Sequence, residues 1–383
     1  MKVILSSRSV YPFQGYGGMQ RYIYFLGKYL QKQGVEVQII TSAEKNEDSN
    51  SREYENIKYN LVHPSVNSPF FHIKYHIFYI NVAKRLKKKD FDVLHSFGGS
   101  ALAYLFLKDR KPTILQPFGN ELFKEKGLKK IRNYILFYLE SKYLHTHADA
   151  IASEGDLQTQ EIINLFGVSK DKIFNLPDGV ELYKINEYIS ENKINREYIG
   201  FNDDDFVLIS VNQLQKIKGL NYLIDAFSII KQYIDDAKLI LIGAGPEEKR
   251  LLYQIKTLNL QNSVLHFKNV DDSLLYNYLS LANVYVSPSL QNCLLLSVLE
   301  GMACGLPVVS VDSQEGAVQH GKNGYVVPQR DSNAIVDAVL KIYDKNQWKQ
   351  MGNISKEIVK DYDWNIIAKK AIIEYEKLIR EKS

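Results

Sequence analysis

The hydrophobic positions of the chain alternate between short apolar runs and longer amphipathic stretches, and they do so in two passes. In the first pass, KVILSS at residues 2–7 predicts a buried strand, and residues 22–30 carry apolar side chains at helical spacing before Gly34 ends the helix. Further strands of this pass are expected at VEVQIIT, FDVLHSF, PTILQPF and DAIAS. This alternation is typical of a parallel sheet covered by helices on both faces.

The second pass begins after a polar segment, residues 183–204, which we interpret as a linker region. Its strands are expected at FVLISVN, AKLILIGAG, VLHF, VYVSPS and PVVSV, with GLNYLIDAFSIIKQY and EEKRLLYQIKTL as helices. The pattern therefore predicts two doubly wound domains, residues 1–182 and 205–362, followed by a helical stretch over 363–383. Two such domains in tandem place a ligand crevice between them, at the carboxyl ends of the strands.

The length and composition suit a cytoplasmic protein of two domains. The chain has 383 residues, more than one hydrophobic core normally accommodates. Its two cysteines, Cys293 and Cys304, form no disulfide framework and indicate a reducing compartment. The apolar run at the start is too short for a signal peptide, and no stretch reaches the roughly 18 apolar residues that a membrane span needs.

Positive charge is concentrated in the first half of the chain, although the net charge is only +4. A basic run follows an aromatic stretch at residues 70–80, and it comprises Lys84, Arg85, Lys87, Lys88 and Lys89. Interfacial helices combine these features, and anionic lipid adds about 1 kcal/mol for each basic residue. Peripheral attachment to the inner face of a membrane is therefore one hypothesis, and a domain helix with a solvated basic face is the alternative. Nucleic acid is not expected as a partner, because the aromatic residues are not spaced as a stacking platform.

Two glycine-containing turns precede helices, one in each predicted domain. Gly17 and Gly18 stand just before the first helix, where bare backbone amides and the helix dipole favour a phosphate. Lys218 and Gly219 open a helix in the second domain, and a lysine there can neutralise a phosphate. Ordinary tight turns and a solvated lysine are the alternative interpretations. The presence of such a turn in both domains favours a ligand that carries phosphate.

Two further motifs fall short of the cofactor sites that they suggest. Gly243 and Gly245 follow a strand, as in a nicotinamide-dinucleotide fingerprint, but Glu248 occupies the position of the third glycine. A tight turn explains these glycines equally well. His72 and His76 have helical spacing without a third ligand nearby, so we expect no metal site and no metal cofactor.

One acid, Glu300, lies inside the apolar run LLLSVLEGMACGL at residues 294–306. Burial of a carboxylate among apolar side chains is costly unless a partner binds it. We therefore expect a ligand, or a second polar group, at this position.

The order of these motifs along nearly the whole chain resembles the family 4 retaining glycosyltransferases. The segments that carry the likeness include GGMQRYIYFLGKYLQKQGVEVQIIT, ADAIASEGDLQTQEIINLFGVSKDKIFNLPDGVEL, KGLNYLIDAF, LIGAGPEEKRL, SVLEGMACGLPVVS and HGKNGYVV. The resemblance implies the GT-B fold, an α/β architecture of two tandem Rossmann-like doubly wound domains facing a central crevice. It also implies that the N-terminal domain is the acceptor side, that the C-terminal domain binds the nucleotide sugar, and that the last helix packs back on the N-terminal domain.

The resemblance assigns roles to individual positions. Gly17 and Gly18 match the glycine pair at the donor diphosphate, and Lys218 matches the lysine that stabilises the leaving diphosphate. Glu300 matches the second acid of a Glu-x7-Glu motif, which accepts hydrogen bonds from the ribose of the donor. The catalytic residues implied are Lys218 and Glu300. The donor-binding residues implied are Gly17, Gly18, Gln213, Lys218, Gly243, Gly245, Asn292 and Glu300. Contacts with the sugar or the acceptor are implied for Phe118, Gly119 and Asp178.

Several of these positions depart from the family pattern. Asn292 stands where the first glutamate of the motif is usual, Gln213 replaces an arginine, and Phe118 replaces a histidine. Asp178 replaces a common asparagine. A lost charge-assisted hydrogen bond costs about 1.5–3 kcal/mol, so these exchanges bear on whether the donor site is active.

The activity implied is the transfer of a sugar, without a metal, from a nucleotide-diphosphate donor to a glycan or lipid-linked acceptor. Such a reaction belongs to the synthesis of cell-surface polysaccharides or glycoconjugates. Two alternatives stay open. One is a catalytically inactive subunit that binds an acceptor or an active partner, and the other is a related nucleotide-sugar enzyme, such as an epimerase, on the same fold.

Overall fold

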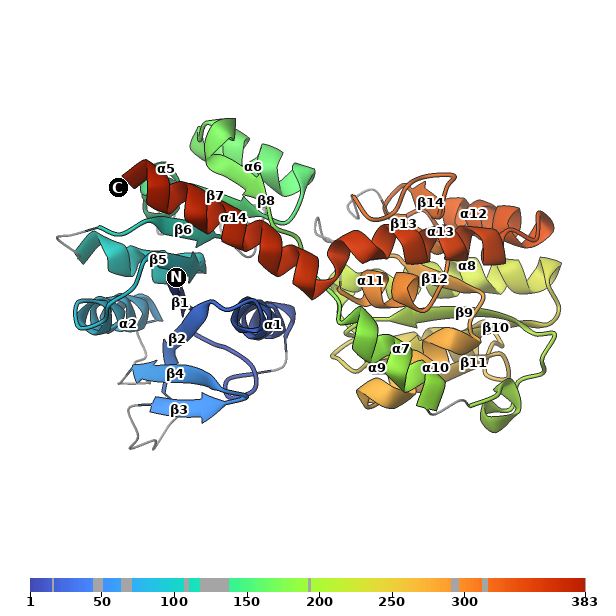
Figure 1. Cartoon of the computed structure of the whole chain (residues 1–383). Helices are drawn as coiled ribbons and strands as arrows, with labels where there is room; N and C mark the ends of the chain where they lie inside the picture. Colours follow the sequence, from blue (N-terminus) through green and yellow to red (C-terminus); the bar gives the residue numbers. More distant parts are fainter. Residues whose placement is uncertain are drawn as a thin grey trace. The chain divides into compact units, whose positions relative to one another are not determined.

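The chain forms two compact units, each built around its own parallel sheet (Figure 1). The computed structural model describes residues 1–15, 17–43, 51–62, 71–106, 110–117, 138–191, 194–290, 296–311 and 316–382. The first unit comprises Met1–Pro177 and Trp364–Ser383, and the second comprises Asp178–Asp363.

The first unit contains an eight-stranded sheet whose strand order is β3-β4-β2-β1-β5-β6-β7-β8. The strands are β1 (Lys2–Ser6), β2 (Glu36–Ser42), β3 (Ser51–Tyr54), β4 (Ile57–Val62), β5 (Val93–Phe97), β6 (Thr113–Gln116), β7 (Ala150–Ser153) and β8 (Ile173–Asn175). All neighbouring strands are parallel except β3 and β4, which form an antiparallel hairpin at one edge.

Helices cover both faces of this first sheet. Among the described residues they are α1 (Gly18–Lys32), α2 (Phe71–Leu86), η1 (Gly98–Phe106), α5 (Leu139–His147), α6 (Asp156–Phe166), η3 (Lys170–Lys172) and α14 (Trp364–Lys382). The core on one face joins the sheet to α1 and α14. The core on the other face joins it to α2, α5 and α6. Strands buried on both sides explain the near-continuous apolar runs of the sequence.

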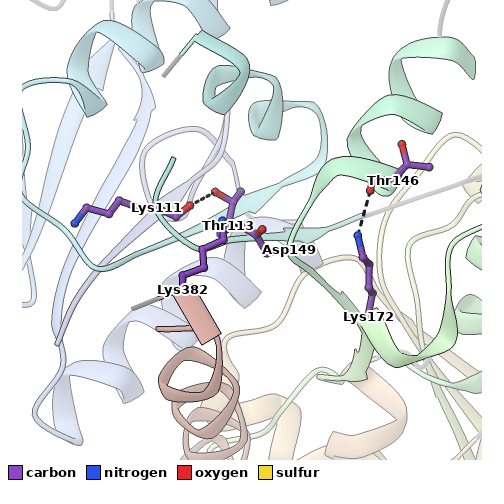
Figure 2. Close-up of polar contacts among 6 residues, drawn as sticks. All are labelled: Lys111, Thr113, Thr146, Asp149, Lys172 and Lys382. Carbon is purple, nitrogen blue, oxygen red and sulfur yellow. Dashed lines mark hydrogen bonds and ion pairs between the residues drawn. The ribbon is translucent and has the colours of Figure 1, made fainter. Parts of the chain in front are cut away.

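Helix α14 comes last in the chain and packs on α1, the first helix (Figure 1). At its start, the indole of Trp364 lies edge-on to Tyr22, with ring centroids 5.2 Å apart, and is stacked on Phe25 at 5.7 Å. At its end, Lys382 forms an ion pair of 2.7 Å with Asp149; Figure 2 draws both side chains. The same carboxylate accepts a hydrogen bond from the backbone N of Thr113, at the start of β6. Both ends of α14 are therefore attached to the first unit.

The second unit contains a six-stranded, fully parallel sheet of order β11-β10-β9-β12-β13-β14. The strands are β9 (Phe206–Val211), β10 (Ala237–Ile242), β11 (Val264–Phe267), β12 (Val284–Ser287), β13 (Val308–Val311) and β14 (Gly324–Val327). The described helices are α7 (Leu182–Glu191), η4 (Arg196–Ile199), η5 (Lys216–Lys218), α8 (Leu220–Tyr233), α9 (Glu248–Thr257), α10 (Asp272–Leu281), α11 (Leu296–Ala303), α12 (Ser332–Asp344), α13 (Trp348–Val359) and η6 (Lys360–Tyr362). Helices α8, α9 and α12 join the core on one face, and α7, α10 and α11 join the core on the other.

The described residues of the segment interpreted as a linker, 183–191 and 194–204, are structured. They contain most of α7 and all of η4, and both belong to the second unit. Ile185 of α7 is buried, and Tyr188 stacks on Tyr276 of α10. The polar surface of this segment therefore belongs to a helix that covers the sheet.

Candidate active site

Three loops meet at the carboxyl edge of the second sheet. The loop after β9 is bonded to the loop after β10, because Leu214 N donates to Ala244 O at 2.9 Å and Glu247 N donates to Leu214 O at 2.9 Å. It is also bonded to the segment after β12, since Leu290 N donates to Ile217 O at 2.8 Å. Ligands of doubly wound sheets bind at this edge. The sequence-predicted positions 213, 218, 243 and 245 all lie in these loops.

Glycines allow these loops to touch. Gly219 has φ +65°, and a Cβ at this position would collide with the carbonyl oxygen of Pro288. Gly243 has φ +140°, and a Cβ there would collide with the carbonyl oxygen of Asn212. Only glycine combines such backbone angles with such close approach. Loop packing therefore explains why position 243 is a glycine. Its contact with a donor stays a prediction.

Lys218 and Gln213 lie on the same loop, the one after β9. Lys218 ends η5, and its backbone N donates to Gln215 O at 2.9 Å. Its side chain is half-buried beside Gly219, the N-cap of α8. Gln213 is exposed, and its Oε1 accepts a hydrogen bond of 3.1 Å from Gln215 Nε2. The loop also carries the exposed Lys216, so it presents two lysines and two glutamine amides, a combination that can bind an anionic group.

Glu300 lies in α11 and is only 5% exposed. Its Oε1 accepts a hydrogen bond of 3.3 Å from the hydroxyl of Tyr276 in α10. The next residue, Gly301, brings α11 close to β12, because a Cβ there would lie 2.7 Å from the ring of Tyr285. A second polar group at the buried acid is thus Tyr276. Sequence reasoning missed it, because no spacing rule relates positions 276 and 300.

In the first unit, Gly17 and Gly18 begin α1. Gly17 is the N-cap, in an extended conformation and without a side-chain cap, and the first turn has no acid. A Cβ on Gly17 would lie 2.5 Å from Gln20 Oε1, whereas a Cβ on Gly18 would meet nothing within 4 Å. The side chain of Gln20 also donates to Ser9 Oγ at 3.1 Å. The side chain of Gln20 therefore fills the space beside Gly17, whereas the space beside Gly18 is open. An open helix N-terminus of this kind can bind an anion.

Among the residues predicted to contact the sugar or the acceptor, the structure describes Asp178. Asp178 is half-buried, and its Oδ1 accepts a hydrogen bond of 2.9 Å from Gly179 N. Phe118, Gly119 and Asn292 lie outside the described residues.

The basic run at the end of α2 is divided between two roles. Arg85 donates to the carbonyl of Leu61 at 3.1 Å, and Lys89 donates to Gln38 Oε1 at 3.0 Å. Desolvation lowers the pKa of Lys89. The exposed members of the run are Lys84, Lys87 and Lys88. Three of the five cations therefore face solvent.

Two features, a metal-binding cluster and a membrane-spanning helix, are absent from the part of the chain that the structure describes. Within the described ranges, no three or more His, Cys, Asp or Glu side chains are grouped so that they could hold a metal ion. No helix in the same ranges has the length and apolar character that crossing a bilayer requires.

Two family models match the chain, and together they span most of it. The model described as Glycosyltransferase Family 4 matches residues 16–184, and the model described as Glycosyl transferases group 1 matches residues 191–360. Among curated proteins, an uncharacterized glycosyltransferase of Methanocaldococcus jannaschii is 27% identical over 95% of both chains. The alpha-monoglucosyldiacylglycerol synthase of Streptococcus pneumoniae is 26% identical over 83% of this chain and 74% of its own.

Solved structures share the fold over nearly the whole chain. Sucrose-phosphate synthase from Thermosynechococcus elongatus aligns with a TM-score of 0.81 and 20% identity over 99% of both chains. The Anabaena protein HepE, in complex with UDP-glucose, aligns with a TM-score of 0.75 and 16% identity over 98% of this chain and 100% of its own. These findings confirm the predicted fold class. The chain belongs to the family 4 glycosyltransferases and has the GT-B fold.

Proposed function

We propose that this glycosyltransferase is a retaining enzyme that moves a sugar from a nucleotide-diphosphate donor to a glycan or lipid-linked acceptor. The observation that carries the proposal is the layer of bonded loops at the carboxyl edge of the second sheet. It presents Lys218, and the buried acid Glu300 lies in α11, the helix that follows β12 at this edge.

Lys218 offsets the negative charge that develops on the leaving diphosphate, because a fixed cation stabilises a transition state more than the ground state. Glu300 accepts hydrogen bonds from the ribose hydroxyls. Gln213 and Asn292 donate through their amides where the family has charged groups. The helix start at Gly17 and Gly18, in the first unit, offers backbone N–H groups that can bind an anionic group of the substrate.

In the proposed reaction, the bond between the anomeric carbon and the phosphate oxygen breaks, and the acceptor oxygen bonds to the same face of that carbon. The proton of the acceptor hydroxyl passes to the departing phosphate oxygen. No carboxylate nucleophile is needed for this same-face route, and the proposal includes no metal.

Two of the similar proteins support the substrate classes. HepE was solved in complex with UDP-glucose, which supports a nucleotide-sugar donor. The name of the Streptococcus pneumoniae relative, alpha-monoglucosyldiacylglycerol synthase, supports a lipid acceptor.

The first test is a thermal-shift titration with UDP, GDP, ADP and their common sugar derivatives. A ligand at 100 times its Kd stabilises a fold by about 2.7 kcal/mol, which gives a visible rise in Tm. We expect one nucleotide to respond, and Glu300→Ala to abolish the response. With that donor and candidate acceptors, NMR of the product then reads the anomeric configuration, and an inverted product would contradict the retaining mechanism.

The neutral amides at positions 213 and 292 favour one alternative, a catalytically inactive subunit that binds an acceptor or an active partner. It predicts that no nucleotide or nucleotide sugar raises the Tm of a well-folded sample. It also predicts that restoring the charges, with Gln213→Arg and Asn292→Glu, creates a response to at least one nucleotide.

We also propose that the protein is cytoplasmic and attaches peripherally to anionic membranes through Lys84, Lys87 and Lys88. These three lysines are exposed at one end of α2. Sedimentation with vesicles of mixed anionic and zwitterionic lipid tests this proposal. Replacing the three lysines by Gln should abolish binding, whereas the same change at the exposed lysines 256, 345 and 349 should not. Absence of binding at low salt would refute it.

A further inference from the structure

The buried carboxylate of Glu300 is held by a side chain that the proposed mechanism does not use. Tyr276 of α10 directs its hydroxyl to Glu300 Oε1 at 3.3 Å, and both residues are buried. The contact joins α10 to α11 across 24 positions of sequence. Glu300 thus has a protein hydrogen-bond donor before any ligand binds.

Tyr276 is itself fixed by packing. Its ring is stacked on that of Tyr188 in α7, with centroids 5.7 Å apart and an angle of 25° between the planes. The ring also belongs to the core that joins α7, α10 and α11 to the sheet. A tyrosine held in this way has one available position for its hydroxyl, so the hydroxyl can fix the rotamer of the carboxylate that it contacts.

The surroundings of Glu300 make this contact matter. The helix bearing it is close to β12 at Gly301 and Tyr285, so the backbone at this point has little freedom. The direction of the carboxylate is then set by the side-chain torsions of Glu300. A glutamate that must meet two ribose hydroxyls loses affinity when those torsions are free, because ordering them on binding costs free energy.

We propose that Tyr276 is a positioning residue for donor binding: its hydroxyl orients the Glu300 carboxylate toward the ribose of the nucleotide. This inference rests on the proposed function, in which Glu300 contacts the donor. Tyr276 acts through Glu300 and makes no contact with the sugar that is transferred. Its loss therefore weakens nucleotide binding and leaves the chemical step nearly unchanged.

The test compares Tyr276→Phe with the wild-type protein in titrations with UDP, GDP and ADP. Phenylalanine keeps the stacked ring and removes only the hydroxyl. Because the contact is longer than most hydrogen bonds to a carboxylate, we expect a Kd increase of about three- to tenfold for the nucleotide that binds. With the matching nucleotide sugar, KM should rise by a similar factor, and kcat should stay within about twofold.

The matched control is Tyr278→Phe on the same helix. Tyr278 is also buried and is stacked on Phe267, with centroids 4.7 Å apart. Residues two positions apart on a helix point in different directions, so the side chain of Tyr278 is not directed to Glu300 as that of Tyr276 is. Its substitution should leave the nucleotide Kd unchanged, even if it lowers Tm as much as Tyr276→Phe does.

A double-mutant cycle with Glu300→Gln decides between positioning and a general loss of packing. In the Glu300→Gln protein, Tyr276→Phe should weaken nucleotide binding no further. Equal weakening in both backgrounds, or no weakening in the wild-type background, overturns the positioning role alone. If Glu300→Gln leaves the Kd unchanged, or if none of the three diphosphates binds, the donor site proposed for Glu300 is overturned and this inference with it.

Discussion

At the scale of single residues, two buried histidines in the first unit link stability to pH. His95 on β5 is fully buried, and its Nδ1 lies 2.7 Å from the hydroxyl of Tyr375 in α14. His145 on α5 is buried against Phe166, with ring centroids 4.0 Å apart. Burial lowers the pKa of His95 to about 3 and that of His145 to about 4. Both imidazoles are therefore neutral in the folded protein at neutral pH.

These shifts predict acid sensitivity. The unfolded chain binds a proton at each histidine below its ordinary pKa of about 6.5, and the folded chain does not, so stability is complete above pH 6.5 and falls as the pH drops toward 4. At pH 5 each histidine should cost about 2 kcal/mol of unfolding free energy. Urea unfolding of the first unit at pH 7.5 and pH 5 measures this difference.

The histidine variants give the control. His95→Gln and His145→Gln should each reduce the loss between pH 7.5 and pH 5, whatever they do to stability at pH 7.5. His147→Gln is the matched change at an exposed histidine of the same helix, and it should leave the pH dependence as it is. A pH dependence that is the same in all three variants would show that other groups cause it.

The sequence identified some of the important residues and could not identify their partners. Glu300 was recognisable because a charge inside an apolar run demands an explanation. Tyr276 was not, since its contact depends on how α10 and α11 pack. Asp205 begins the second domain that the hydrophobic pattern predicts, and the pattern gives it no partner. It is only 3% exposed, and its carboxylate accepts a hydrogen bond from Asn202 N. Partners of this kind follow from tertiary packing, and one sequence carries no direct record of it.

At the scale of elements, α11 depends on Gly301 for its distance from the sheet. Gly301→Ala places a methyl group 2.7 Å from the ring of Tyr285, which is fully buried in β12. We expect a loss of about 1–3 kcal/mol of stability, as for other overpacked cores. The displaced helix should also weaken nucleotide binding, because Glu300 precedes the substituted residue. Thermal denaturation and nucleotide titration measure the two effects.

Gly155→Ala is the comparison for this prediction. A Cβ at Gly155 would meet nothing within 4 Å, so the same substitution there should change Tm much less. A Gly301→Ala protein as stable as the wild type would mean that α11 can move away from β12 without cost.

The strands that the hydrophobic pattern missed are β3, β4, β8 and β14. The pattern predicted β1, β2, β5, β6 and β7 of the first unit and β9 to β13 of the second. It missed the hairpin β3–β4, whose turn residues Glu55 and Asn56 have φ of 45° and 62°. Glutamate is unusual in such a turn, so the usual hairpin signal was absent. It also missed β8 and β14, which have three and four residues.

At the scale of the whole molecule, the chain closes the first unit with its last helix. Sequence patterns place a helix after the second sheet, but only the family resemblance indicated where it packs. The structure shows two kinds of attachment in α14. Trp364 is 1% exposed and lies among Tyr22, Phe25 and Tyr29. Lys382, at the other end, forms its ion pair with Asp149 while both side chains are partly exposed.

These two attachments should differ greatly in strength. Trp364→Ala removes a large buried ring and should cost about 3–5 kcal/mol, whereas Lys382→Ala breaks a partly exposed ion pair and should cost at most about 1 kcal/mol. Hydrogen exchange followed along the chain locates the loss. For Trp364→Ala we expect protection to fall in β1, β5 and α1, whose residues share the core with Trp364. The strands β9 and β12, whose residues belong to other cores, should keep their protection. If protection fell equally in all of these strands, the chain would unfold as one cooperative body. The two compact units would then differ in their internal contacts but would not unfold independently.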